Sequence, residues 1–173
     1  MSPLQIAGAY SAFAAGGVFT EPFTIERIVA PDGEILYESP HSERVMSEAT
    51  AYMITSTLRS TMTHGSGQRA QVSGQWLAGK TGTTNFPDEI RQRWNLRFGA
   101  VPDVWFAGFS MDYTVAIWTG YESINDGTFL IGTDRNIPRD LFGIIMTELN
   151  TAGMAAPERP STVVRRDVEW QSG

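Results

Sequence analysis

The stretch GQWLAGKTGTT, residues 74–84, decides the interpretation of the chain, because two incompatible structures fit its letters. Its first eight residues satisfy the phosphate-loop pattern G-x-x-x-x-G-K-[ST], in which backbone N–H groups at a helix start hold phosphates. Such a loop follows an apolar strand and opens a helix. Here the preceding QRAQVS (68–73) is polar, and Gly82 and Pro87 interrupt any following helix. We therefore predict an extended strand over 76–84 and no nucleotide site.

Side chains alternate along a strand, so Thr81 and Thr83 should share one face while Lys80 points to the other. Gly82 between the threonines leaves room for another backbone to lie alongside. We expect an edge strand that pairs with an extended peptide, whose terminal carboxylate the two hydroxyls and a buried Lys80 ammonium would bind. An ordinary small-residue strand with a solvated lysine is the alternative, and the tripeptide alone leaves both open.

Composition limits the classes of function. The chain has 173 residues, 42% of them hydrophobic, which is enough for a real core and for one domain or a large part of one. Its formal net charge of -6 disfavours nonspecific binding to nucleic acid or anionic lipid. Cysteine is absent, and His41 and His64 are too far apart in sequence to form a local metal-ligand pair. We expect no metal, no cofactor and no nucleic-acid partner.

Local signals predict an α+β fold with an antiparallel sheet packed against helices. Ser2, Pro3 and Gln5 form a capped helix start, and Ser47 caps a second helix. Pro31-Asp32-Gly33 indicates a tight turn. The expected elements are a helix from Ser2 to Gly16, a hairpin of strands 23–30 and 34–39, a helix from Ser47 to His64, strands 76–84, 103–110 and 113–121, and a helix opened by Pro138 whose apolar face is Leu141, Ile144, Ile145 and Leu149.

The connection over 85–102 is unusually long and carries arginines beside Trp94 and Phe98. Contact with glycan or an acidic peptide is one interpretation, but a solvated loop with its aromatic side chains packed on the body is favoured. We also expect Trp105, Phe106 and Trp118 to belong to the core. The opening residues lack a basic segment, so neither a signal peptide nor a membrane span is predicted there.

Successive blocks of the chain read SPLQIAGAYSAFAAGGVFTEP, IVAPDGEILYE, AGKTGTTN, DVWFAGFS and YTVAIWTGYE. In this order they resemble the transpeptidase domain of class A penicillin-binding proteins, whose signature includes Lys-Thr-Gly and Ser-x-x-Lys. The resemblance covers most of residues 2–150. It implies a β-lactamase/transpeptidase-like fold present only as its C-terminal portion, over residues 1–156. The local composition of residues 157–173 predicts a linker that can return as a short strand.

The resemblance also implies an activity: serine acyl transfer that crosslinks D-Ala-D-Ala peptide stems of peptidoglycan and that β-lactam antibiotics intercept. It assigns catalytic roles to Lys80 and Thr83, the latter through a backbone N–H in the oxyanion hole. It assigns substrate binding to Thr81, Gly82 and Thr83. It further implies an extracytoplasmic location, at the outer face of the bacterial cytoplasmic membrane.

The chain departs from the family at the nucleophile. Ser-x-x-Lys requires a lysine, and the only lysine, Lys80, follows Leu77 by three residues. We therefore expect the nucleophile, the N-terminal half of the domain and any membrane anchor to lie outside these residues, leaving this chain alone inactive and with exposed apolar surface. A serine D,D-carboxypeptidase, a β-lactamase relative and a noncatalytic cell-wall peptide-binding module remain alternatives, which the coding sequence upstream of Met1 would separate.

Overall fold

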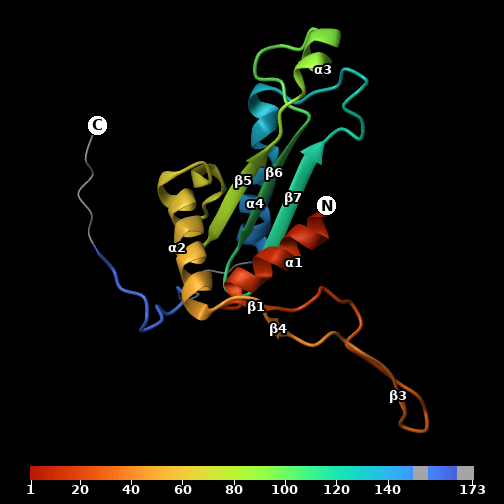
Figure 1. The fold of residues 1–173 in the computed structure, drawn as a ribbon, viewed down its shortest axis with the longest axis vertical. Helices are drawn as coiled ribbons and strands as arrows, with labels where there is room; N and C mark the ends of the chain where they lie inside the picture. Colours follow the sequence, from red (N-terminus) through yellow and green to blue (C-terminus); the bar gives the residue numbers. More distant parts are fainter. Residues whose placement is uncertain (150–155, 167–173) are drawn as a thin grey trace.

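The structure is a computed structural model that describes residues 1–149 and 156–166. Four α-helices are described: α1 (Pro3–Ala14), α2 (Glu48–His64), α3 (Asp88–Arg93) and α4 (Ile137–Glu148), together with the 3-10 helices η1 (Gln68–Ala70) and η2 (Gly132–Asn136). The strands are β1 (Val18–Phe19), β2 (Arg27–Val29), β3 (Ile35–Glu38), β4 (Glu43–Arg44), β5 (Ala78–Thr83), β6 (Asp103–Phe109) and β7 (Thr114–Gly120). The predicted α+β class is confirmed, with a sheet surrounded by helices (Figure 1).

The main sheet has the order β5-β6-β7, and both pairs are antiparallel. Thr81 lies opposite Phe106 in the register of β5 and β6. The turn between β6 and β7 is closed by a hydrogen bond of 2.9 Å from the N–H of Ser110 to the carbonyl of Tyr113. The predicted extended structure over Lys-Thr-Gly and the predicted 103–121 hairpin are therefore confirmed, and the helix that a phosphate loop needs after its lysine does not form.

The core divides into two layers because side chains alternate across the sheet. Phe106 of β6 and Phe142 of α4 meet on one face, with ring centroids 4.8 Å apart. Phe109 of β6 packs on the other face with residues of α1 and α2, among them Phe13 and Leu58. Helix α4 and helix α1 thus cover opposite faces of one sheet, α1 lying in front of it and α4 behind it in Figure 1.

The predicted buried face of α4 is wrong. Leu141, Ile144 and Leu149 are exposed and Ile145 is partly buried, whereas the residues that α4 fully buries are Pro138, Phe142 and Met146. The helix carries two overlapping apolar stripes of helical spacing, so periodicity alone could not choose between them. The stripe that contains the large aromatic ring packs against Phe106, which leaves the aliphatic stripe in solvent.

The predicted helix starts are confirmed. The N–H of Ser2 donates to Oε1 of Gln5 at 2.8 Å, and the N–H of Gln5 donates to Oγ of Ser2 at 3.3 Å. Ser47 accepts from the N–H of Thr50 at 3.1 Å through its Oγ. These caps satisfy N–H groups that have no partner inside the helix.

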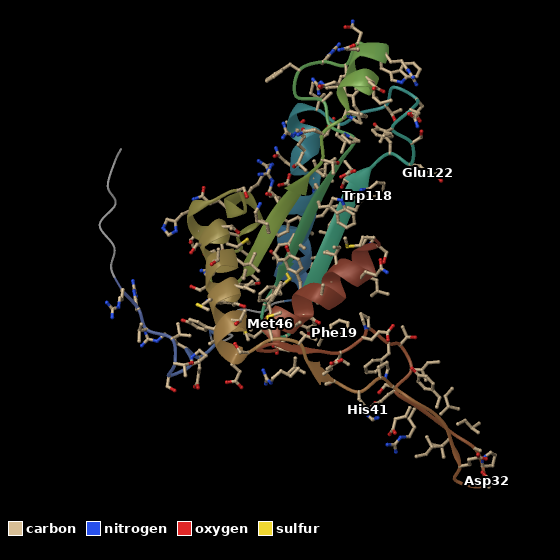
Figure 2. The ribbon with its side chains drawn as sticks, in the orientation of Figure 1. Phe19, Asp32, His41, Met46, Trp118 and Glu122 are labelled. Atoms are coloured by element: carbon tan, nitrogen blue, oxygen red, sulfur yellow. The ribbon has the colours of Figure 1, made fainter. Side chains whose placement is uncertain are left out.

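The 23–39 hairpin is confirmed as β2 and β3, with strands shorter than predicted and a register irregularity between Ile28 and Val29. It projects from the body, with Asp32 at its tip and His41 nearer its base (Figure 2). All residues of both strands are exposed, including Leu36 at 61%. No described helix is long and apolar enough to cross a membrane.

Three further expectations need correction. The 85–102 connection contains helix α3, and Phe98 is 99% exposed, so this ring is not packed on the body. Trp118 is 40% exposed and belongs to the core only in part, whereas Phe106 is fully buried. Residues 161–166 form no strand, and the remainder of the predicted returning strand lies outside the described residues.

Candidate active site at the edge of the sheet

The outer edge of β5 is organised by side chains instead of another strand. Arg59 of α2 donates to the carbonyl of Leu77 at 2.9 Å, and Thr61, also of α2, donates to the carbonyl of Gly79. The ammonium of Lys80 donates to the carbonyl of Thr81 at 2.9 Å. The acceptors are alternate residues, as expected for carbonyls that point away from β6.

This alternation predicts that the N–H of Thr83 also points outward, beyond the part of the edge that α2 contacts. In the described chain, no strand pairs with this edge of β5. Thr83 therefore offers its outward backbone to an extended peptide, and the Thr81 carbonyl is bonded to the exposed Lys80 side chain, while Leu77 and Gly79 are bonded to α2.

The threonine side chains border a pocket of about 310 Å³ between β5 and the start of α4. Its lining comprises Ser66, Thr81, Gly82, Thr83, Val104, Trp105, Gly132, Arg135, Asn136 and Arg139. The structure thus brings the predicted substrate-binding residues together on one cavity, in agreement with strand alternation. Lys80 is not part of this lining, and its side chain is exposed, so the expectation of a buried ammonium is wrong.

Ser66 was missed by the sequence analysis. Its hydroxyl oxygen lies 2.9 Å from that of Thr81, and its carbonyl accepts from Nη1 of Arg139 at 3.1 Å. In the sequence, Gly65 and Gly67 indicate the end of the preceding helix, and this signal alone gives Ser66 no function. A small hydroxyl residue held between two glycines was the only local signal.

A second contact ties the same loop to α4. Nε and Nη2 of Arg69 lie 2.5 and 2.9 Å from the two carboxylate oxygens of Asp140. The hydrogen bond from Arg69, supported by the charges of Arg69 and Arg139, holds the pKa of Asp140 below its usual value. This bidentate geometry fixes orientation as well as distance. The segment after α2 is therefore fastened to the start of α4 at two points.

The charge around the pocket is positive although the chain is acidic overall. Arg135 and Arg139 line the pocket, and no acidic side chain does so in the described part of the chain. The carboxylates nearest in sequence have other partners: Asp140 pairs with Arg69, and Asp134 accepts from the N–H of Ile131 at 3.4 Å. Hydroxyl groups and guanidinium groups around one cavity suit an anionic ligand.

The arginines of the 85–102 segment have unequal roles. Arg91 donates to the carbonyls of Ala100 and Arg97, at 3.3 and 3.4 Å, and so braces its own loop. Arg93 and Arg97 have exposed side chains. None of them lines the pocket beside Thr81.

Comparison with known families gives a match over most of the chain. The family model described as penicillin binding protein transpeptidase domain matches residues 1–141. The chain is 39% identical over 170 residues to penicillin-binding protein 1A/1B of Bacillus subtilis (strain 168), which covers 98% of the chain and 18% of that relative. It is 36% identical over 147 residues to penicillin-binding protein 1A of Streptococcus pneumoniae, which covers 84% and 20%. The chain thus spans about a fifth of the length of these relatives.

Solved structures show the same fold. The PonA1 protein of Mycobacterium tuberculosis in complex with penicillin V superposes with a TM-score of 0.68 at 22% identity, covering 91% of this chain and 41% of that one. Penicillin binding protein 3 of M. tuberculosis complexed with aztreonam gives a TM-score of 0.60 at 28% identity, covering 88% and 36%. The antiparallel sheet with its flanking helices is therefore a partial transpeptidase fold.

Proposed function

Because the chain belongs to the penicillin binding protein transpeptidase domain family, we propose that it supplies the Lys-Thr-Gly side of the active site of a peptidoglycan D,D-transpeptidase. In this proposal residues 1–156 are the C-terminal portion of that domain. The protein works outside the cytoplasmic membrane, joins one peptide stem to another by serine acyl transfer, and is acylated by β-lactams. The observation that carries the proposal is the open end of β5, where Thr81 and Thr83 border a cationic pocket.

Each residue of the strand has a distinct task. The stem peptide pairs with the free edge of β5, and its terminal carboxylate accepts from the hydroxyls of Thr81 and Thr83. Gly82 lets the guest backbone approach closely. The N–H of Thr83 stabilises the oxyanion of the tetrahedral intermediate, a contribution worth about a hundredfold to a thousandfold in turnover in another serine hydrolase.

Lys80 is the proton-handling and electrostatic group. It is the single lysine among thirteen basic residues, and unlike arginine it can release a proton. Its ammonium now bonds to the Thr81 carbonyl. In the complete site it would move toward the nucleophilic serine and the leaving group.

The neighbouring structures support β-lactam binding as part of the proposal. The relative at 28% identity is complexed with aztreonam, and the curated relatives are named penicillin-binding proteins. The serine is the part that this sequence does not contain, since it has no Ser-x-x-Lys. Acylation therefore requires a serine from outside these residues.

Capture of fluorescent penicillin tests the proposal. The segment of B. subtilis penicillin-binding protein 1A/1B that aligns with this chain is replaced by the matching stretch of this chain, so that the host protein supplies a Ser-x-x-Lys. We expect the folded chimera to be labelled, the isolated chain to remain unlabelled, and Lys80→Ala to slow labelling by about a hundredfold, the lower range for loss of a proton-transfer group. Equal labelling with and without Lys80 would remove its assigned role.

A noncatalytic peptide-binding module is the second candidate, favoured by the open edge of β5, which can pair with an extended peptide without any nucleophile. Such a module would use the same strand edge to hold a cell-wall stem without cleaving it. A folded chimera that binds the stem peptide but captures no penicillin would support this second function over the first. Transfer of the stem's acyl group to water in place of an amine, after the terminal D-Ala has left, would indicate a carboxypeptidase.

A further inference from the structure

The pocket beside Thr81 is lined by an arginine that is not part of the Lys-Thr-Gly motif. Arg135, on η2, lines the pocket, and its side chain is exposed. In the described residues its guanidinium has no hydrogen-bond or ion-pair partner. The group is therefore available to a ligand without breaking an existing contact.

Arg139 lines the same pocket but is already engaged. Its Nη1 donates to the carbonyl of Ser66 at 3.1 Å, and its Nη2 donates to the side chain of Asn136. Its Nε is buried and has no partner in the described part of the chain. Arg139 thus fixes the position of the Ser66 loop and adds positive potential, while Arg135 remains the free donor.

The opposite wall of the pocket supplies hydroxyl groups. Thr81 and Thr83 extend from β5 toward the face that α4 covers, and Ser66 lies within hydrogen-bond distance of Thr81. An anion between these walls would accept from hydroxyls on one side and from a planar guanidinium on the other. A guanidinium offers two parallel donors, which match the two oxygens of a carboxylate.

We propose that Arg135 is a specificity-determining residue that binds the terminal carboxylate of the ligand across the pocket from Ser66, Thr81 and Thr83. The inference rests on the proposed function, since the ligand it implies is an acyl-peptide with a free carboxylate. In this arrangement the positive charge that balances the carboxylate comes from Arg135 on η2 and Arg139 on α4. Lys80 on the other face of β5 is then left for proton transfer.

The experiment uses the folded chimera described above, with its host Ser-x-x-Lys serine changed to alanine so that the ligand is not consumed, and titrates it calorimetrically with N-acetyl-D-Ala-D-Ala and, separately, with its C-terminal amide. We expect saturable binding of the acid and much weaker binding of the amide. Arg135→Ala should weaken acid binding by about fivefold, the scale of an exposed charge pair. Raising the salt concentration should lower the affinity of the parent for the acid until it approaches that of the variant.

Two variants serve as controls. Arg135→Lys keeps the charge but loses the bidentate geometry, so it should restore only part of the affinity. Arg93→Ala removes the same charge from an exposed site on α3 that does not line the pocket, and it should bind the acid like the parent.

Two results would overturn the inference: equal acid binding by the parent and Arg135→Ala, and equal binding of acid and amide by the parent. The outcome is distinguishable from a failure of the proposed function. Arg135-dependent acid binding together with a folded chimera that captures no penicillin would retain the carboxylate site and reject the catalysis.

Discussion

The hydroxyl oxygens of Ser66 and Thr81 lie 2.9 Å apart, although the residues are separated by 15 positions in sequence. One belongs to the segment after α2 and the other to the edge strand that carries the Lys-Thr-Gly motif. The loop that carries Ser66 is held by Arg139 of α4. The outer edge of the strand that carries Thr81 is bonded to side chains of α2. The geometry of the pocket therefore depends on both helices.

Arg139 should control the order of the Ser66 loop. Arg139→Lys removes the planar group that reaches both the Ser66 carbonyl and the Asn136 side chain, so the loop should open more often. We expect amide hydrogen exchange at residues 66–69 to accelerate by about tenfold, the effect of losing a bond of roughly 1.4 kcal/mol. Arg135→Lys is the control, since among the described residues the Arg135 side chain makes no hydrogen bond or ion pair with that loop, and it should leave exchange unchanged. Unchanged exchange in Arg139→Lys would contradict the positioning role.

The ion pair between Arg69 and Asp140 should make stability depend on pH. The folded pKa of Asp140 is lowered, chiefly by its hydrogen bond from Arg69. The pair therefore contributes fully above the ordinary aspartate pKa of about 3.9, and the contribution disappears as the pH falls through the lower folded value.

Urea denaturation of the parent and Asp140→Asn from pH 2 to pH 6 measures this effect. The variant should be less stable at pH 6 and equal to the parent at pH 2, with a small difference because both side chains are about half exposed. Asp112→Asn changes an exposed carboxylate without an ion pair among the described residues and should show no such trend. A difference that persists at pH 2 would assign the effect to packing.

Much of the fold follows from local signals in the sequence. The capping box of Ser2 and Gln5 and the cap at Ser47 depend on residues three positions apart, and the 103–121 hairpin depends on a short turn. The alternation that places Thr81 and Thr83 on one face is likewise local. These features could be predicted because their partners are adjacent in the chain.

The missed features depend on distant partners. The buried face of α4 is chosen by Phe106 of the sheet, and the role of Ser66 depends on Thr81 and Arg139. Helix α3 had a local signal, since acidic residues occupy its first turn and basic residues its last, but the segment was too short for clear periodicity. The exposed position of Lys80 could not be read from a motif that fixes only its backbone.

The corrected face of α4 can be tested by two truncations in the same helix. Phe142 is fully buried against Phe106, whereas the neighbouring Leu141 is 41% exposed. Phe142→Ala should cost about 3–5 kcal/mol of the free energy of unfolding, and Leu141→Ala should change it by less than about 1 kcal/mol. If denaturant titrations gave similar losses of unfolding free energy for both variants, the face predicted from periodicity would be the buried one.

Two glycine substitutions should have opposite effects. A Cβ at Gly108 of β6 would lie 2.8 Å from both the Ala78 carbonyl oxygen and Cζ of Phe142, so the backbone or the ring must move. A Cβ at Gly143 of α4 would meet only the Ala70 carbonyl oxygen, at 3.8 Å. We expect Gly108→Ala to lower the melting temperature and Gly143→Ala to raise stability by up to about 1 kcal/mol, the helix propensity difference. Destabilisation by both would argue against the packing between α4 and β6.

The isolated chain should be only marginally stable, because large apolar side chains remain in solvent on several elements. Leu4 of α1 is 64% exposed, and Ile35 and Leu36 of β3 are 53% and 61% exposed. Helix α1 is apolar on most of its surface but fully buries only Gly8 and Ala12, and a helix that is hydrophobic all round is normally enclosed. A two-stranded hairpin such as β2–β3 also has little independent stability.

Calorimetry of the isolated chain should therefore give a broad transition with aggregation. Leu36→Lys should reduce the aggregation without lowering the transition temperature, since the Leu36 side chain is mostly exposed. A sharp, reversible melting transition of the unmodified chain would show that its exposed apolar surface needs no covering.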